Sequence, residues 1–494
     1  MKAVALNRGS LSRLRPPVRV PRYDPAGVRA GVVHLGLSAF HRAHMARYTH
    51  ELMEADPGAL GWGTAGAGLL PADRRMQESL VPQDGLYTLV ERDGVGETVS
   101  VIGSVAEVIH AGESTAALLA RIDDPAIRIL SLTVSENGYC LNPATRQLDP
   151  EHPMVRADLA APDRPRSAVG VIVEAYRRRM AAGGGPFTAL TCDNIQNNGD
   201  VLREAVLALA GLRDAGLARW IAAHGAFPNS MVDRITPATR PDHVEHLEHH
   251  YGIRDRWPVF CESFTQWVIE DRFAAGRPEW ERVGAQIVPD VVPYEMMKLR
   301  LLNGSHLAIA VLGRLMGYRF VHEVMADPRM RAYMAALMDR ETGPTLAPVP
   351  GVDLAVYKRT LVERFANPAI EDTVERINTD APINLLVMPI EAGLAIGGEV
   401  ELLALALAAW MRRLRGVDDK GAPIEIRHPL APLLQQKAEE GGRDPMPLLS
   451  IETLFGGLGR EERFVVPLRR WLASLYDIGA EGTLERAMRE LVAG

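Results

Sequence analysis

The sequence has 494 residues and a formal net charge of −7, and 47% of its residues are hydrophobic and 24% charged. This length is enough for two or three domains, and the composition is that of a globular enzyme. No basic stripe or basic-aromatic cluster stands out, which argues against nucleic acid as the main partner. The three cysteines lie far apart without a CxxC pair, so they give no disulfide framework or zinc cluster. No apolar run reaches transmembrane length, and the first residues lack the apolar core of a signal peptide, so we expect a cytoplasmic protein.

The first predicted strand and helix form the opening step of a nucleotide-binding sheet. Residues 31–40 read as a buried strand and a tight turn, and residues 43–55 as the helix that follows. Backbone N–H groups at such a helix start can hold a pyrophosphate. The glycine fingerprint GxGxxG is incomplete, because its positions hold Gly36, Ser38 and His41. The pattern alone is therefore a weak signal.

A second short strand, 62–68, is followed by Asp73. An acid after the second strand can accept both ribose hydroxyls of NAD, and it can equally cap the next helix. The pattern leaves both interpretations open. Residues 86–91 and 97–108 alternate in polarity and predict strands, joined by a hairpin through Asp93 and Gly94.

Three later strands end in polar residues. The strands are 127–134, 187–191 and 228–235, and the polar residues at or just after their ends are Glu136, Asn194 and Asp233. Ligands of doubly wound sheets gather at the carboxyl ends of the strands, so these residues are candidates for a site.

The pattern changes near residue 287. Before it, strands alternate with helices; after it, the segments are almost all helical. We therefore predict an α/β N-terminal Rossmann-type domain over 1–286, followed by a mostly α-helical C-terminal domain over 287–494. The predicted helices of the second domain are 293–316, 327–340, 353–365, 391–413, 429–437, 462–476 and 483–492.

The first of these helices is apolar on every side, which is typical of a buried helix, yet it carries four polar residues. Glu295, Lys298, Asn303 and His306 fall within an arc of about 140°. The chain has only five lysines among 55 basic residues. Because a buried lysine can be tuned to give up its proton and an arginine cannot, a lysine kept here suggests proton transfer. The plain alternative is a lysine that snorkels at the helix edge.

A dinucleotide fold with one lysine and one or two amides suits the interconversion of an alcohol and a ketone. The cofactor carries the hydride, a lysine can act as the base, and asparagine N–H groups can donate to the alkoxide. The sequence has no GxSxG or Walker A pattern, so it gives no support for acyl or phosphoryl transfer. His246 and His250 have the spacing of two metal ligands, but a solvated helix face is the more ordinary interpretation.

Several stretches resemble the polyol-specific long-chain dehydrogenases, the mannitol dehydrogenase family, over nearly the whole chain. The matching stretches are 32–44, 73–76 with 83–88, 133–139, 192–194, 231–237, 266–271, 276–278 and the signature Lys298-x4-Asn303-x2-His306. The resemblance implies a Rossmann-type domain, a helical domain, a site between them without a metal, and a monomer.

The resemblance also implies roles for individual residues. Lys298 is expected to be the general acid/base, Asn194 and Asn303 the oxyanion hole, and His306 the residue that orients substrate hydroxyls. Glu136 and Glu295 are expected on a proton path, and Asp233 and Arg376 on the polyol chain. The segment expected around the cofactor pyrophosphate includes Val33, His34, Gly36, Ser38, Phe40, His41, Arg42, Ala43 and His44. Asp73 lies near the position where the family selects NAD over NADP, so we expect NAD, with NADP possible.

Two departures from the family pattern bear on these expectations. Ser38 and Ala39 replace two glycines of the usual turn, which predicts a retained cofactor turn with altered geometry. Asn384 stands where a substrate-binding lysine is expected, so the choice of substrate stays open. We expect oxidation of D-mannitol to D-fructose. The alternatives are reduction of fructuronate or tagaturonate, which the lost cation weakly disfavours, and a dinucleotide-binding protein without catalysis.

Overall fold

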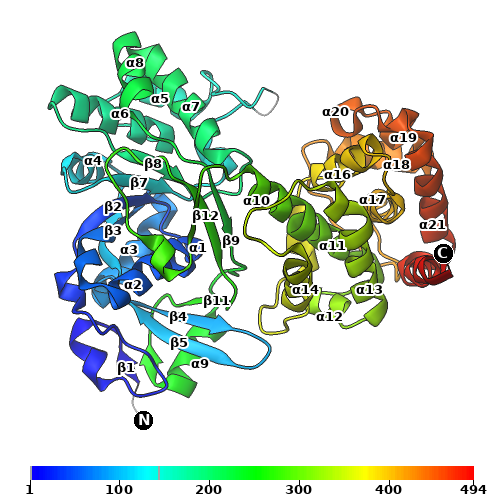
Figure 1. Cartoon of the computed structure of the whole chain (residues 1–494), viewed down its shortest axis with the longest axis horizontal. Helices are drawn as coiled ribbons and strands as arrows, with labels where there is room; N and C mark the ends of the chain where they lie inside the picture. Colours follow the sequence, from blue (N-terminus) through cyan, green and yellow to red (C-terminus); the bar gives the residue numbers. More distant parts are fainter. Residues whose placement is uncertain (1–2, 143–144, 494) are drawn as a thin grey trace. The chain divides into compact units, whose positions relative to one another are not determined.

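The computed structural model describes residues 3–142 and 145–493, which divide into two compact units, Met1–Val292 and Pro293–Gly494 (Figure 1). Within these described residues, no helix is long and apolar enough to cross a membrane. Among these residues, the sheets all lie in the first unit, and the second is built from helices. This arrangement confirms the predicted fold class.

A parallel sheet forms the centre of the first unit. Its strands, among the described residues, are β2 (Ala30–Leu35), β3 (Gly63–Gly68), β6 (Val105–His110), β7 (Ile129–Leu132) and β8 (Thr188–Thr191). They are hydrogen-bonded in the order β6-β3-β2-β7-β8; Figure 1 labels β3, β2, β7 and β8 of this sheet. Numbered along the chain, that order is 3-2-1-4-5, as in Rossmann folds, and the strand order reverses between β2 and β7. A ligand crevice is therefore expected beyond the carboxyl ends of these two strands.

Alternate residues of β2 face opposite layers of helices. Val33 and Leu35 pack into a core with α4 and α6, whereas Val32 packs with α2. A central parallel strand must bury both faces, which explains its continuous apolar run. The helices of this unit are α1 (Ala39–Ala43), α2 (Met45–Ala55), α3 (Arg74–Leu80), α4 (Ala116–Asp123), α5 (Pro153–Ala160), α6 (Ala168–Ala181), α7 (Asn198–Arg213), α8 (Ala215–His224) and α9 (Pro241–Tyr251).

Smaller sheets complete the first unit. Their strands are β1 (Val4–Ala5), β4 (Tyr87–Arg92), β5 (Glu97–Ile102), β9 (Ser230–Asp233), β10 (Ile253–Arg254), β11 (Val259–Glu262), β12 (Gln266–Glu270) and β13 (Gln286–Val288), in the orders β1-β10, β11-β4-β5 and β13-β12-β9. The hairpin between β4 and β5 is present as predicted. The single strand predicted over 97–108 is wrong, because the chain breaks at Gly103 and Ser104 and continues as β6 in the central sheet.

The second unit packs around α17, whose interior is almost entirely buried against α11 and α21. Its helices are α10 (Val292–Met297), α11 (Gly304–Met316), α12 (Val321–Met325), α13 (Pro328–Ala336), α14 (Leu354–Phe365), α15 (Val374–Asp380), α16 (Asn384–Ala395), α17 (Glu401–Arg413), α18 (Ala431–Gly441), α19 (Met446–Leu449), α20 (Glu452–Phe455) and α21 (Glu462–Ala493). The single helix predicted over 391–413 is two helices, α16 and α17, because Gly397 takes a positive φ between them.

Candidate functional site

The turn after β2 requires a glycine. Gly36 has a φ of +89°, and a Cβ placed on it would lie 2.1 Å from the carbonyl oxygen of Thr133. Thr133 follows β7, so this contact brings together the two strands at which the sheet order reverses. A side chain at position 36 would push them apart. The predicted nucleotide turn therefore lies where a doubly wound sheet binds its ligand.

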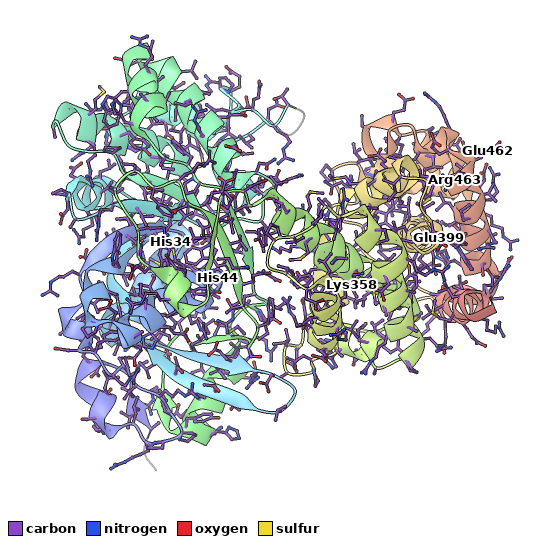
Figure 2. All side chains as sticks on the ribbon, in the orientation of Figure 1. His34, His44, Lys358, Glu399, Glu462 and Arg463 are labelled. Carbon is purple, nitrogen blue, oxygen red and sulfur yellow. The ribbon has the colours of Figure 1, made fainter. Side chains whose placement is uncertain are left out.

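His34, labelled in Figure 2, lies in β2 just before this turn, and its side chain links β2 to β7. Its Nδ1 lies 2.8 Å from Ser131 Oγ, and its Nε2 lies 2.9 Å from Thr133 Oγ1 and 3.1 Å from the Gly36 carbonyl. The ring of His41 stacks on it, with centroids 3.6 Å apart. Burial lowers the pKa of His34 to about 3, so the ring is neutral when its two nitrogens make these contacts. The His34 side chain therefore connects the turn at Gly36 to the end of β7.

Ser38 begins the helix that follows the turn. Its side chain accepts a hydrogen bond from the backbone N–H of His41 at 3.4 Å, and it precedes α1. A serine is a good N-cap and a glycine is weaker, so this departure from the family pattern suits the helix start. The chain then bends at His44, where φ is −117° and ψ −94°, and α2 begins. The helix predicted over 43–55 is therefore present as α2, and α1 is a short additional helix in the segment predicted as a turn.

The predicted cofactor residues of α1 differ in where their side chains lie. Val33, which lies in β2 before this helix, and Ala43 are wholly buried, so their side chains pack in the core. Arg42 is also fully buried: its guanidinium lies 4.2 Å from the ring centroid of Trp257 and donates to the carbonyl of that residue. Phe40 stacks on His44, with centroids 5.0 Å apart. The side chain of Arg42 thus packs within the first unit.

Asp73 lies just beyond the carboxyl end of β3. Its carboxylate accepts a hydrogen bond from the backbone N–H of Leu70 at 2.9 Å, and it makes no capping hydrogen bond to α3. A Cβ on Gly68 would lie 2.3 Å from the Cβ of Asp73, so a glycine at the end of β3 lets the carboxylate approach the sheet. The carboxylate thus lies near the carboxyl end of a central strand, where doubly wound sheets bind their ligands.

The ends of β7 and β8 are joined by a carboxylate that the sequence analysis missed. Asp193 accepts hydrogen bonds from the backbone N–H groups of Val134 and Ser135, at 3.2 and 2.8 Å. Ser135 has a φ of +61°, which is rare for a residue other than glycine. Glu136 and Asn194, on either side of this anchor, are exposed. The position of Asp193 at a strand end, between Cys192 and Asn194, was the sequence signal that could have identified this contact.

β9 ends at Asp233, and Arg234 follows it in the chain. Asp233 is buried at the end of the strand, and the guanidinium of Arg234 donates to the carbonyl oxygens of Ala43 and Glu262 at 2.5 and 3.0 Å. Arg234 therefore links the end of β9 to β11 and to the end of α1. This link holds Asp233 in place relative to the nucleotide turn within the first unit.

The helix predicted over 293–316 is not a regular α-helix. Between α10 and α11, Lys298–Asn303 (η8) form a π-helical turn, closed by a hydrogen bond from the N–H of Gly304 to the carbonyl of Leu299. Hydrogen bonds in a π-helix join residues five apart, so Lys298 and Asn303 lie one above the other on one face. π-helical turns in α-helices are frequent at functional sites.

The polar residues of this helix are mostly buried. Glu295, Lys298 and His306 are each 7% exposed, and the Oδ1 atom of Asn303 is buried without a hydrogen bond from the described residues. Removing charged groups from water costs several kcal/mol unless other groups compensate, so this face is expensive to build for stability alone. The second unit therefore brings together four of the predicted residues.

A second carboxylate missed by the sequence analysis joins two predicted residues. Asp372 accepts two hydrogen bonds from the guanidinium of Arg376, at 2.7 and 2.6 Å, and its Oδ2 lies 3.6 Å from Nε2 of His306. The ring of His306 stacks on Phe365 with centroids 5.0 Å apart. Asp372 and Arg376 are four residues apart in a segment where no helix is predicted, so the sequence pattern does not indicate that they pair.

Asn384 is exposed at the first position of α16, which packs against the π-helical turn. A Cβ on Gly304 would lie 3.1 Å from the carbonyl oxygen of Leu385, the residue after Asn384.

The histidine pair with the spacing of metal ligands lies in the first unit, where His246 lies 2.6 Å from a carboxylate oxygen of Glu97. Among residues 3–142 and 145–493, no three His, Cys, Asp or Glu side chains gather as a metal site would need.

Both units match models of known protein families. A family model described as the mannitol dehydrogenase Rossmann domain matches residues 30–282, and one described as the mannitol dehydrogenase C-terminal domain matches residues 290–476. Mannitol 2-dehydrogenase of Aspergillus fumigatus is 42% identical, over 98% of this chain and 99% of that protein.

Solved structures agree with this assignment. Mannitol 2-dehydrogenase of Pseudomonas fluorescens, in a ternary complex with NAD and D-mannitol, is 44% identical, with 98% of this chain and 100% of that chain covered and a TM-score of 0.88. D-sorbitol dehydrogenase in substrate-free form is 33% identical, with 97% and 100% covered and a TM-score of 0.88. Identity at this level over both units confirms the resemblance seen in the sequence motifs, and the chain belongs to the mannitol dehydrogenase family.

Proposed function

We propose that this chain is an NAD-dependent oxidoreductase that interconverts a sugar alcohol and a ketose, with D-mannitol and D-fructose as the pair. One observation carries the proposal: the π-helical turn that puts Lys298 and Asn303 on one face, with His306 three residues further. This face occurs in a chain 44% identical to an enzyme solved with NAD and D-mannitol.

The first unit supplies the groups that fit NAD. Gly36 keeps the turn after β2 open for a close backbone approach, and Asp73 stands after β3 where it can accept the ribose hydroxyls. The carboxylate favours NAD, because a 2′-phosphate would meet a negative charge. When bound, the nicotinamide ring accepts or delivers the hydride.

In the proposed mechanism Lys298 Nζ takes the proton of the reacting hydroxyl during oxidation and returns it during reduction. The side-chain N–H groups of Asn194 and Asn303 donate to the oxygen on which negative charge develops. His306 and Arg376, with Asp233, hold the other hydroxyls of the chain. Glu136 and Glu295 pass the proton onward to water.

We propose that this proton transfer uses no metal ion. The chemistry that a zinc ion supplies in other alcohol dehydrogenases, activation of the hydroxyl, is here assigned to Lys298 and the two amides. Dialysis against EDTA is expected to leave the rate unchanged. A loss of activity restored by one divalent cation would contradict this part of the proposal.

A second substrate is favoured by the similarity to D-sorbitol dehydrogenase. D-Sorbitol differs from D-mannitol at one carbinol carbon and yields the same ketose when oxidised at C2. Because Asn384 at the start of α16 leaves the family's usual cation out, discrimination among polyols rests on other residues. A carboxylate-bearing substrate such as fructuronate finds less support for the same reason.

The test measures nicotinamide absorbance with mannitol, sorbitol, arabinitol, fructose, fructuronate and tagaturonate. Turnover is expected with mannitol and fructose. The variant Lys298→Ala is expected to lose at least about 100-fold in kcat, since positioned proton transfer is typically worth that much, while the Kd for NAD stays unchanged. Lys437→Ala, which removes a surface lysine paired with Glu440, is the matched control. Activity of Lys298→Ala within about tenfold of the wild type would show that the acid/base role is wrong.

A further inference from the structure

Asp372 makes contacts that the proposed mechanism does not yet use. It lies between α14 and α15, one residue before Thr373, whose side chain caps α15. Its carboxylate is 8% exposed and touches two side chains assigned to the substrate, through both Nε and Nη2 of Arg376 and, at 3.6 Å, Nε2 of His306. One buried anion thus meets two groups from two different helices, α11 and α15.

The charge of Asp372 is maintained by its neighbours. Burial alone would raise the pKa of its carboxyl, but the hydrogen bonds from Arg376 and the proximity of His306 bring it below the usual value. The carboxylate is therefore ionised at neutral pH. A paired, hydrogen-bonded anion in a buried place costs more to disrupt than an exposed ion pair.

The geometry restricts the motion of both partners. Two parallel hydrogen bonds fix the plane of the Arg376 guanidinium, which one hydrogen bond would leave free to swing. The His306 ring stacks on Phe365, and its Nε2 edge faces the Asp372 carboxylate at 3.6 Å. Side chains that receive substrate hydroxyls work best when such contacts orient them before binding.

We propose that Asp372 is a positioning residue that orients Arg376 and His306 together for the hydroxyls of the substrate chain. This inference rests on the proposed function, because it needs a polyol or ketose as substrate. Asp372 itself touches no reacting atom in this scheme. Its loss therefore acts on how the substrate is held more than on the proton or hydride transfer.

A purely structural role would depend on different contacts. The backbone carbonyl of Asp372 accepts a hydrogen bond from the N–H of Val321 at 2.9 Å, and Thr373 caps α15. The variant Asp372→Asn keeps both, and removes the charge and one acceptor oxygen. Asp418→Asn is a matched control, since Asp418 is also buried in the second unit and pairs with Arg314 at 3.2 Å.

The test is steady-state kinetics of fructose reduction and mannitol oxidation, with NAD affinity and melting temperature measured on each variant. Asp372→Asn is expected to raise KM about tenfold, which is a loss of substrate binding, and to lower kcat less than about threefold. The double variant Asp372→Asn/Arg376→Ala is expected to raise KM by less than the product of the two single effects, because part of what Asp372 does is done through Arg376. Asp418→Asn should lower the melting temperature and leave KM unchanged.

The outcomes separate the two proposals. A wild-type protein without turnover on any polyol or ketose would overturn the proposed function and, with it, the role of Asp372. Wild-type turnover together with an unchanged KM in Asp372→Asn, or with additive effects in the double variant, would overturn only the role of Asp372. If Asp372→Asn does not fold, Asp372→Glu keeps the charge at a displaced position. A rise in KM there supports the positioning role, and wild-type kinetics overturn it.

Discussion

The backbone N–H of Gly304 donates to the carbonyl of Leu299, five residues earlier, and this hydrogen bond marks the π-helical turn beside Lys298. In a regular α-helix, residues 298 and 303 would point about 140° apart. The wider turn stacks them, so an ammonium and an amide share one face. The relation is local, and the proposed mechanism depends on it, because Lys298 and Asn303 are proposed to act on the same oxygen.

We predict that Gly304→Ala alters substrate affinity with little change in stability. A Cβ there would lie 3.1 Å from the carbonyl oxygen of Leu385, so the start of α16 must shift by a few tenths of an ångström. The gain of about 1 kcal/mol in helix propensity offsets much of that cost. Expected is a rise in KM for the polyol of about threefold or more, with an unchanged Kd for NAD, measured by steady-state kinetics and NAD titration.

The control for this prediction is Gly211→Ala in α7. A Cβ on Gly211 meets nothing within 4 Å, so the same propensity gain comes without a shift of any neighbour. The variant should melt slightly higher and keep its KM. Equal kinetics for Gly304→Ala and Gly211→Ala would mean that the contact between α16 and the turn has no role in binding.

A different glycine controls the cofactor turn. We predict that Gly36→Ala abolishes measurable NAD binding and destabilises the protein by more than about 2 kcal/mol, because φ is +89° and the new Cβ would lie 2.1 Å from Thr133 O. Gly94→Ala, in the hairpin between β4 and β5 with open space around it, should do neither. Calorimetric titration with NAD and thermal unfolding measure both effects. A Gly36→Ala protein that still binds NAD would show that the turn lies elsewhere.

Much of the architecture could be predicted from the sequence, because it rests on local patterns. The buried strand before Gly36, the acid after β3 and the change to helices near residue 287 all follow from periodicity and turn chemistry. The separation of β5 from β6 could not be predicted, because both strands alternate in polarity and only two residues, Gly103 and Ser104, lie between them. The two strands belong to different sheets, and no local pattern indicates this.

The missed parts of the site are long-range or depend on backbone geometry. Asp193 acts by accepting N–H groups from the end of another strand, and Asp372 by pairing with residues of two helices. Neither contact leaves a trace in spacing. The π-helical turn is likewise invisible, since a helix that is apolar on all sides shows no shift of phase when one turn widens.

The buried histidines near the nucleotide turn predict acid sensitivity. Burial lowers the pKa of His41 well below its usual value, and its ring nitrogens have no hydrogen-bond partner among the described residues. The folded protein therefore keeps this ring neutral while the unfolded chain binds a proton below about pH 6.5. Stability contributed in this way is present above that pH and is lost as the pH falls.

We predict that His41→Leu loses less stability on acidification than the wild type, by about 2 kcal/mol between pH 7 and pH 5. The measurement is the free energy of unfolding as a function of pH. His249→Leu, on an exposed part of α9, should keep the wild-type dependence. Identical slopes for His41→Leu and the wild type would show that His41 binds a proton as readily in the folded protein as in the unfolded chain.

The second unit contains a buried carboxyl with the opposite pH dependence. Glu341 accepts hydrogen bonds from the N–H groups of Leu402 and Leu403, at 2.6 and 2.7 Å, at the start of α17. Burial raises its pKa to about 7 despite those hydrogen bonds. Since the pKa is higher in the folded than in the unfolded protein, the carboxyl stabilises the fold most below about pH 4.5. That stability is lost as the pH rises through 7.

We predict that the stability advantage of the wild type over Glu341→Gln shrinks by about 2 kcal/mol between pH 5 and pH 8. The amide keeps a neutral group of the same shape, and it cannot ionise, so only the wild type is penalised at high pH. Glu399→Gln is the control, because Glu399 (labelled in Figure 2) is exposed and pairs with Arg340, and the loss of such a surface pair costs at most about 1 kcal/mol. A constant difference between wild type and Glu341→Gln over this range would mean that Glu341 ionises as readily in the fold as in the unfolded chain, and that the start of α17 offsets the cost of burial completely.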